Sequence, residues 1–147
     1  MSIFKTINTS ASGLTAQRMR LDVISDNIAN VNTTRTEDGG PYRRKEAVLQ
    51  SKEDDSFQRF LRNSMNKQKT HQPGVRVSHI DEDQSPFLEK YQPDHPDADE
   101  NGIVQKPNVN IVTEMTNMIS ANRAYEANIT SINTAKSMAM RSLEIGR

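Results

Sequence analysis

A seven-residue repeat near the start of the chain constrains its fold most. In the stretch SGLTAQRMRLDVISDNIANVNT (12–33), Leu14, Leu21 and Ile28 follow one another at intervals of seven residues. Alternating steps of three and four between apolar residues mark one narrow face of a helix. The pattern predicts a helix of roughly 40 Å over residues 3–31, with Ser10 and Gln17 interrupting an apolar stripe formed by Ile7, Leu14, Leu21, Ile24, Ile28 and Val31.

A second helix is predicted at the other end of the chain. Pro107 closes the preceding loop, Asn110 is a good N-cap, and Glu114 and Arg141 suit the first and last turns because they complement the helix dipole. This helix would be roughly 50 Å long. Asn122 and Lys136 interrupt its stripe of Ile111, Met115, Met118, Tyr125, Ile129, Ile132, Ala139 and Leu143.

The middle of the chain has a different pattern. Residues 32–46 are rich in turn formers, and two short β-prone runs, 74–80 and 87–91, flank the polar sequence DEDQSP. Two such runs around a polar link predict an exposed hairpin or β-ribbon. The stretch DSFQRFLRNSM (55–65) spaces its apolar residues as a short helix does, and a strand is the alternative.

The fold class follows from the narrowness of the two stripes. Isolated amphipathic helices are marginal in water, and only 33% of the residues are hydrophobic, so each helix needs a partner. We expect a mainly α fold with a small β and loop middle segment, in which the terminal helices pair as an antiparallel coiled coil. The expected domains are an N-terminal helix (1–33), a middle segment (34–107) and a C-terminal helix (108–147).

Composition excludes several classes of protein. Basic and acidic residues balance at 19 each, so no overall field favours nucleic acid or an anionic membrane. The chain has no cysteine, which excludes disulfides and thiolate chemistry. It has neither an apolar run of membrane-spanning length nor the apolar core of a cleaved signal peptide. No catalytic grouping or phosphate-binding loop is present, so we expect neither an enzyme nor a cofactor.

One loop partly matches a calcium-binding pattern. Asp97, Asp99, Asn101 and Gly102 fit the first positions of an EF-hand loop, but Asn108 stands where the bidentate glutamate belongs. A rigid acidic loop is the favoured interpretation. The three histidines, His71, His79 and His95, have no second ligand at a suitable spacing, and the basic run 43–45 is interpreted as a solvated face.

Asparagines cluster where the first helix should end. Asn27, Asn30 and Asn32 suit a helix terminus, because asparagine tolerates the left-handed backbone, and Asn122 suits a polar position that sets the register of a seam. A functional interpretation is that these amides fix the geometry between subunits. Both interpretations hold together if the helix exit determines where the middle segment lies.

The stretch 12–33 resembles the N-terminal signature of bacterial flagellar rod, hook and hook-associated proteins, in which a Ser-Gly-Leu start leads to Asn-Ile-Ala-Asn-x-Asn-Thr. The segments GGPYRRKEAVLQ (39–50), HPDADENGIVQKPNVNIVTEM (95–115) and MISANRAYEANITSINTAKSMAMRSLEIGR (118–147) are similar to the proximal-rod members of that family. The resemblance implies a structural subunit of the flagellar rod, which crosses the periplasm. Its helices would line the export channel, and it would be exported unfolded by the flagellar type III apparatus without a cleaved signal peptide.

The implied partners are further copies of the chain, other rod proteins and the export apparatus, with no nucleic acid and no membrane span. The basic run 43–45 is expected to meet the acidic loop 94–100 of a neighbouring copy. Two alternatives stay open: a coiled-coil adaptor or export chaperone for axial proteins, and a calcium-regulated module. The predicted assembly interface comprises Ile7, Leu14, Leu21, Asn27, Ile28, Asn30, Val31, Asn32, Met115, Met118, Asn122, Tyr125, Ile129, Ile132 and Leu143.

Overall fold

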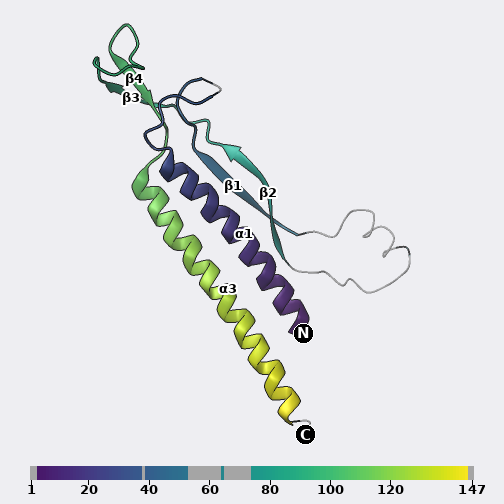
Figure 1. Ribbon diagram of the computed structural model, residues 1–147. Coiled ribbons are helices and arrows are strands. Elements are labelled where there is room, and N and C mark those ends of the chain that lie inside the picture. Colours follow the sequence, from purple (N-terminus) through teal and green to yellow (C-terminus); the bar gives the residue numbers. More distant parts are fainter. Residues whose placement is uncertain (1–2, 38, 53–63, 65–73, 146–147) are drawn as a thin grey trace.

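The computed structural model describes residues 3–37, 39–52, 64 and 74–145. Two long helices dominate it, α1 (Ile3–Ala29) and α3 (Ile111–Ile145), as the sequence predicts (Figure 1). Four short strands lie between them in the chain: β1 (Lys45–Ser51), β2 (Val75–Glu82), β3 (Leu88–Tyr91) and β4 (Ile103–Lys106). The prediction of a mainly α fold with a small β middle segment is confirmed. The stretch 55–65, predicted as a short helix or strand, lies almost wholly outside the described residues.

The two helices lie side by side and run in opposite directions (Figure 1). Two contacts set their register. A Cβ atom built on Gly13 would lie 2.9 Å from the side-chain amide of Asn128, and the Asn27 amide hydrogen-bonds Glu114 at 3.1 Å. Residue 13 of α1 thus lies beside residue 128 of α3, and residue 27 lies beside residue 114. Both steps are fourteen residues long but run in opposite directions, as expected of an antiparallel pair. A larger residue at position 13 would meet the Asn128 side chain, which would have to shift to keep this close approach.

The seam between the helices is small and polar rather than purely apolar. Met118, Tyr125 and Ile132 are half-buried as part of the predicted stripe, but Met115 and Ile129 are exposed. Small or polar residues lie in much of the seam instead of the predicted apolar ones, because they allow the helices to approach closely. The buried or half-buried residues of α3 are Glu114, Asn117, Met118, Ala121, Ala124, Tyr125, Asn128, Ile132, Ala135 and Ala139, and the buried residues of α1 are Ser10, Gly13, Ala16, Val23, Ile24 and Asn27.

The strands form two separate antiparallel ribbons, β1 with β2 and β3 with β4. The prediction that 74–80 and 87–91 pair with each other as a hairpin or β-ribbon is therefore wrong. Both runs are strands, but β2 ends in a turn at 83–85 that directs the chain to the second ribbon. Strand propensity does not identify the pairing partner, which depends on contacts distant in sequence.

The first ribbon packs along α1, with a register shift between Val48 and Leu49. The backbone N–H of Val75 donates to the Ser12 hydroxyl at 3.1 Å, which joins β2 to the helix. The second ribbon lies at the far end of the helix pair, beyond the C-terminus of α1 (Figure 1). None of the helices in the described ranges is long and apolar enough to span a bilayer.

The helix ends follow local hydrogen bonds. Asn110 is confirmed as the N-cap of α3, because its side-chain oxygen accepts hydrogen bonds from the N–H groups of Val112 and Thr113 at 3.0 and 3.2 Å. The first helix ends at Ala29, two residues before the predicted end at Val31. There the Asn30 amide donates to the Asp26 carbonyl at 2.9 Å, as expected of an asparagine at a helix terminus.

Candidate assembly surface

Asn27 lies at the junction of α1, β1 and α3. Its side chain is fully buried and its amide makes four hydrogen bonds. The nitrogen donates to the Lys45 carbonyl at 2.8 Å and to Glu114 Oε2 at 3.1 Å. The oxygen accepts from the Tyr42 hydroxyl at 3.0 Å and from the Lys45 N–H at 2.9 Å. A buried amide with every bond made fixes the relative position of its three neighbours.

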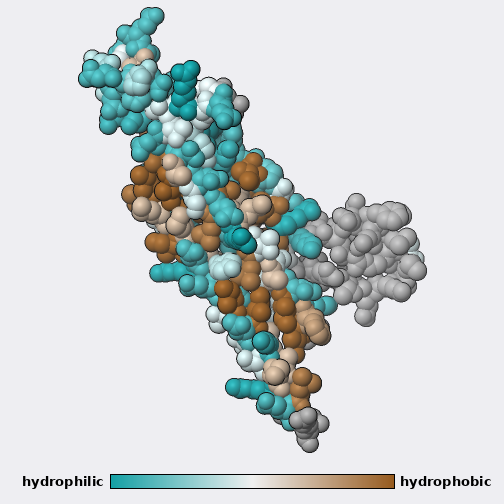
Figure 2. Space-filling model, viewed as in Figure 1, coloured by the Kyte–Doolittle hydropathy of each residue, from teal (hydrophilic) through white to brown (hydrophobic). Residues whose placement is uncertain are grey.

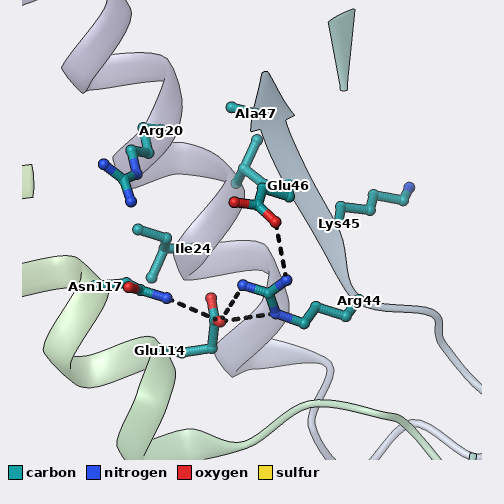
Figure 3. A pocket seen from close by; sticks show the side chains of 9 residues that line it. Arg20, Ile24, Arg44, Lys45, Glu46, Ala47, Glu114 and Asn117 are labelled. Carbon is teal, nitrogen blue, oxygen red and sulfur yellow. Dashed lines mark hydrogen bonds and ion pairs between the residues drawn. The ribbon is translucent and has the colours of Figure 1, made fainter. Parts of the chain in front are cut away.

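Arg44 and Glu114 complete this junction. The guanidinium contacts Glu114 Oε1 through Nη2 at 2.9 Å and through Nε at 3.0 Å, and Nη1 bonds Glu46 at 3.3 Å (Figure 3). Asn117 also approaches the Glu114 carboxylate in Figure 3, at 3.4 Å. Glu114 is 1% exposed. Burial acts to lower the pKa of Arg44, but the hydrogen bond and charge of Glu114 outweigh it, and the pKa is raised.

The buried negative charge also affects the pKa of Tyr42. Its pKa is raised above the ordinary value of 10.0, first by burial and then by the negative charges of Asp26 and Glu114. The phenol therefore stays protonated and continues to donate to Asn27. We call Asn27, Tyr42, Arg44 and Glu114 the junction cluster.

Arg43 and Asn108 hold the turn between the ribbons. Arg43 Nη1 donates to the carbonyls of Asp83 and Ser85 at 2.9 and 3.3 Å, and its guanidinium stacks 4.3 Å over the ring of Phe87. The Asn108 amide donates to the same two carbonyls and accepts from the Arg44 N–H at 2.8 Å. The interpretation of 43–45 as a solvated face is therefore wrong for both arginines, which are bound within the chain. The Lys45 side chain is turned away from Glu114 in Figure 3, and its Nζ lies 5.7 Å from the centre of the Tyr42 ring.

The predicted heptad residues lie beside the seam. Leu14 follows Gly13, and Ile28 follows Asn27; on α3, Ile129 follows Asn128 in the same way. Since one residue turns a helix by about 100°, each of these residues lies a quarter turn from the seam. The helices are antiparallel, so the same step brings both rows to the same side of the pair.

We call this side the open side. The first ribbon packs on the opposite side of α1, where Ser12 precedes Gly13. Apolar residues gather over both helices on the face shown in Figure 2. On α3, Met115 is 52% exposed and Ile129 is 38% exposed, whereas Leu14, Leu21 and Ile28 on α1 are half-buried.

The other predicted interface residues are distributed around the helices. Ile7 and Val31 are half-buried on α1 or just after it, Asn30 is half-buried at the helix end, and Asn32 is exposed. On α3, Asn122 is exposed in the row of Met115 and Ile129. Leu143 is 71% exposed in the last turns, which extend past the first residue of α1 (Figure 1). The structure thus brings together part of the predicted set along one side of the pair.

The acidic loop is closed by its own carboxylates. Asp99 accepts hydrogen bonds from the backbone N–H groups of Asn101 and Ile103, and Asp97 accepts from the Thr34 hydroxyl at 2.7 Å. Gly102 has a φ of 74°, the left-handed conformation that a tight turn favours. Within the described ranges no three His, Asp or Glu residues gather around a possible metal position. The bonds favour the interpretation as a rigid acidic loop.

Sequence reasoning missed the junction cluster as a group. Asn27 was singled out for a helix end, and Glu114 for a helix dipole, but neither Tyr42 nor Arg44 was assigned to them. The available signals were an acidic residue in the first turn of the predicted C-terminal helix and a basic run in the turn-rich middle segment. Nothing in their spacing indicated that they would meet, because 70 residues separate them.

Comparison with known proteins places these features in a family. Residues 7–35 match the family model described as flagella basal body rod protein, and residues 100–145 match the model described as flagellar basal body rod FlgEFG protein C-terminal. These ranges contain most of α1 and all of α3.

Full-length relatives agree with the family models. The flagellar basal-body rod protein FlgC of Borreliella burgdorferi is 48% identical over 155 aligned residues, which cover 99% of this chain and 98% of the relative. FlgC of Bacillus subtilis is 48% identical and FlgC of Salmonella typhimurium is 38% identical, each over all of both chains. The resemblance found in the sequence is confirmed, and the chain belongs to the FlgC family of flagellar basal-body rod proteins.

Proposed function

We propose that this chain is a structural subunit of the proximal rod, in which its two helices form an antiparallel coiled coil that neighbouring subunits cover. Further copies of the chain and other rod proteins would pack on the open side and on the last turns of α3. The rod would cross the periplasm, transmit torque and surround the export channel, through which the unfolded chain arrives by the type III apparatus.

The observation that supports this proposal most directly is the apolar surface that the helix pair leaves uncovered. Met115, Ile119 and Leu143 are 52%, 56% and 71% exposed on α3. Contiguous exposed apolar surface on a small protein marks an interaction site. Burying a side chain of this size stabilises an interface by about 1.5 to 3 kcal/mol, so a few such contacts repeated between subunits suffice to hold a polymer.

A head-to-tail arrangement is consistent with the shape of the chain. The two ends of the helix pair differ: one carries the ribbons and the junction cluster, and the other is a single overhanging stretch of α3 (Figure 1). Different surfaces that contact one another in successive copies generate rings or helical filaments. A rod is such a filament, and torque would pass through many modest contacts of this kind.

The proposal is tested by a charge placed on the open side. In a strain that lacks its own copy of the protein, Ile129→Asp should abolish swimming and the recovery of rods, because every subunit would bury an unpaired carboxylate. Thr134→Asp is the matched control, since Thr134 is also exposed on α3 but lies five residues on, which turns it away from the open side. Normal swimming with Ile129→Asp would contradict the proposal.

The adaptor alternative gives a different result in a second measurement. A rod subunit remains in purified basal bodies in a fixed ratio to the other rod proteins, whereas an adaptor or chaperone is lost during purification. Quantitative mass spectrometry of basal bodies that contain the wild-type chain distinguishes the two. Absence of the chain from these particles would exclude the role of a rod subunit.

A further inference from the structure

The junction cluster joins three segments that lie far apart in the sequence. Asn27 belongs to α1, Tyr42 and Arg44 lie just before β1, and Glu114 comes from the first turn of α3. The contact between α1 and the start of β1 is thus completed by a carboxylate that only the docked α3 supplies.

We propose that the junction cluster is a conformational latch: docking of α3 along α1 inserts Glu114 between Asn27 and Arg44 and thereby locks the direction in which the strands leave the helix pair. While α3 is undocked, Asn27 keeps its bonds to Lys45 and Tyr42 but lacks the one to Glu114, so the orientation of the strands relative to α1 is less tightly fixed. This inference concerns the single chain and does not depend on which neighbours the rod provides.

The burial and charge of Glu114 support a latch. A carboxylate that is 1% exposed is stable only if its charge is matched, and Arg44 provides the match with two bonds to Oε1. Oε2 is taken by the Asn27 amide. If α3 moved away, Arg44 would keep only Glu46 and Asp83 at 3.3 and 3.5 Å, and Asn27 would keep a donor without one of its acceptors. Docking and locking are therefore energetically coupled.

The remaining contacts do not replace this coupling. Asn108, which precedes α3, holds the turn at Asp83 and the Arg44 N–H. These bonds tie the start of α3 to the strands and do not involve α1. Asn27 is held to Tyr42 and Lys45 by three bonds that do not involve α3, and Glu114 supplies the fourth, which links α3 directly to the end of α1. Glu114 therefore adds to the contact between α1 and the strands and tightens it.

Spin-label distances measure this orientation directly. The chain has no cysteine, so Asp22→Cys on α1 and Glu89→Cys on β3, both at exposed positions, take two labels in the otherwise unchanged full chain. Neither label is on α3, which keeps the measurement independent of that helix. In dilute solution we expect a narrow distance distribution for the labelled wild type. A broad distribution there would overturn the proposal.

Two variants then open the latch in different ways. Glu114→Gln removes the charge without changing the shape, and Ala121→Asp places a carboxylate at a fully buried seam position two turns away from the cluster. Both should broaden and shift the distribution. The matched controls, Glu126→Gln and Asn122→Asp, change exposed positions on the same helix and should not alter the distribution.

The outcomes separate a latch from a simple loss of stability. Circular dichroism shows whether Glu114→Gln retains its helices. If the helices are retained and the distance broadens, the latch is supported; if they are retained and the distance stays narrow, it is refuted. The double variant Arg44→Gln, Glu114→Gln removes both charges and should restore a narrower distribution than Glu114→Gln alone, and failure to do so also counts against the latch.

Discussion

The guanidinium of Arg44 and the carboxylate of Glu114 lie 2.9 Å apart although 70 residues separate them in the chain. One comes from the entrance of the first strand and the other from the first turn of the last helix. Their contact joins the strands to α3, and the bond between Glu114 and Asn27 adds α1 at the same end of the helix pair. At the opposite end of the pair, α3 extends past the start of α1 (Figure 1).

Adjacent residues of the basic run should differ sharply in their tolerance to charge reversal. Arg44→Glu would place a second carboxylate against Glu114 and should lower the free energy of unfolding by about 3 to 5 kcal/mol, the cost of breaking a buried ion pair. Lys45→Glu should lower it much less, because the Lys45 side chain is turned away from Glu114 (Figure 3) and makes only a 5.7 Å contact with the Tyr42 ring. Urea denaturation of both variants, followed by circular dichroism, checks the difference. Equal stability of the two would contradict the buried role of Arg44.

Substitution of two asparagines in the N-terminal signature, Asn27 and Asn32, should change the free energy of unfolding by very different amounts. Asn27→Ala removes four hydrogen bonds at a fully buried position and leaves the Tyr42 hydroxyl and Glu114 without that partner, so we expect a loss of about 2 to 4 kcal/mol. Asn32→Ala is the control, because Asn32 is exposed. The same denaturation experiment measures both. A smaller effect at position 27 than at position 32 would disprove the assigned role.

The helices were predictable because their length and amphipathic pattern are strong local signals. The seam was only half predictable. Met118 and Tyr125 are apolar and lie in it, but Gly13 and Asn128 were selected for close approach, which hydropathy does not reveal. The most regular heptad residues of α1, such as Leu21, lie beside the seam.

Strand pairing and the junction cluster could not be derived from the sequence. Both depend on contacts between residues far apart, and local propensity holds no information on which of several short strands pair. The turn at 83–85 illustrates this point. Its polar sequence is typical of a hairpin loop, yet Arg43 and Asn108 bind its carbonyls and direct the chain away from that hairpin.

Tyr42 should titrate above its ordinary pKa of 10.0. Because the folded pKa is raised, the protonated phenol stabilises the fold fully below pH 10.0, and this contribution is lost as the pH rises through the folded pKa. In the variant Tyr91→Phe, Tyr125→Phe, Tyr42 is the single tyrosine left, so phenolate absorbance reports it alone. Adding Glu114→Gln should bring the midpoint down, since one of the negative charges is removed. A midpoint at or below 10.0 in the folded protein would contradict the burial of this phenol.

The pKa of Asp83 should be shifted in the opposite direction, to below its ordinary value. The hydroxyl and then the N–H of Ser85 hold the pKa of this carboxyl below its ordinary value of 3.8. The carboxylate therefore stabilises the turn above pH 3.8, and this contribution is lost as the pH falls through the lower, folded pKa. An NMR titration of the Ser85 amide proton follows the change. Ser85→Ala removes the hydroxyl and should raise the midpoint, and an unchanged midpoint would show that the hydroxyl bond does not form.

The close approach at Gly13 can be tested with a double-mutant cycle. Alanine is favoured over glycine inside a helix by about 1 kcal/mol, but in the wild type its Cβ would lie 2.9 Å from the Asn128 amide, which is held by its bond to the Ala124 carbonyl. Gly13→Ala alone should therefore destabilise the chain or leave it unchanged. In an Asn128→Ala background the obstacle is gone, and the same substitution should stabilise the chain by about the full helix-propensity difference.

Urea denaturation of the four chains gives the coupling free energy directly. As a control, the same cycle with Thr134→Ala in place of Asn128→Ala should show no coupling, because Thr134 is exposed and faces away from the seam. A coupling near zero in the Gly13 and Asn128 cycle would mean that the two helices do not approach one another at this level. In that case the antiparallel register that places Asn27 beside Glu114 would lose its second point of support.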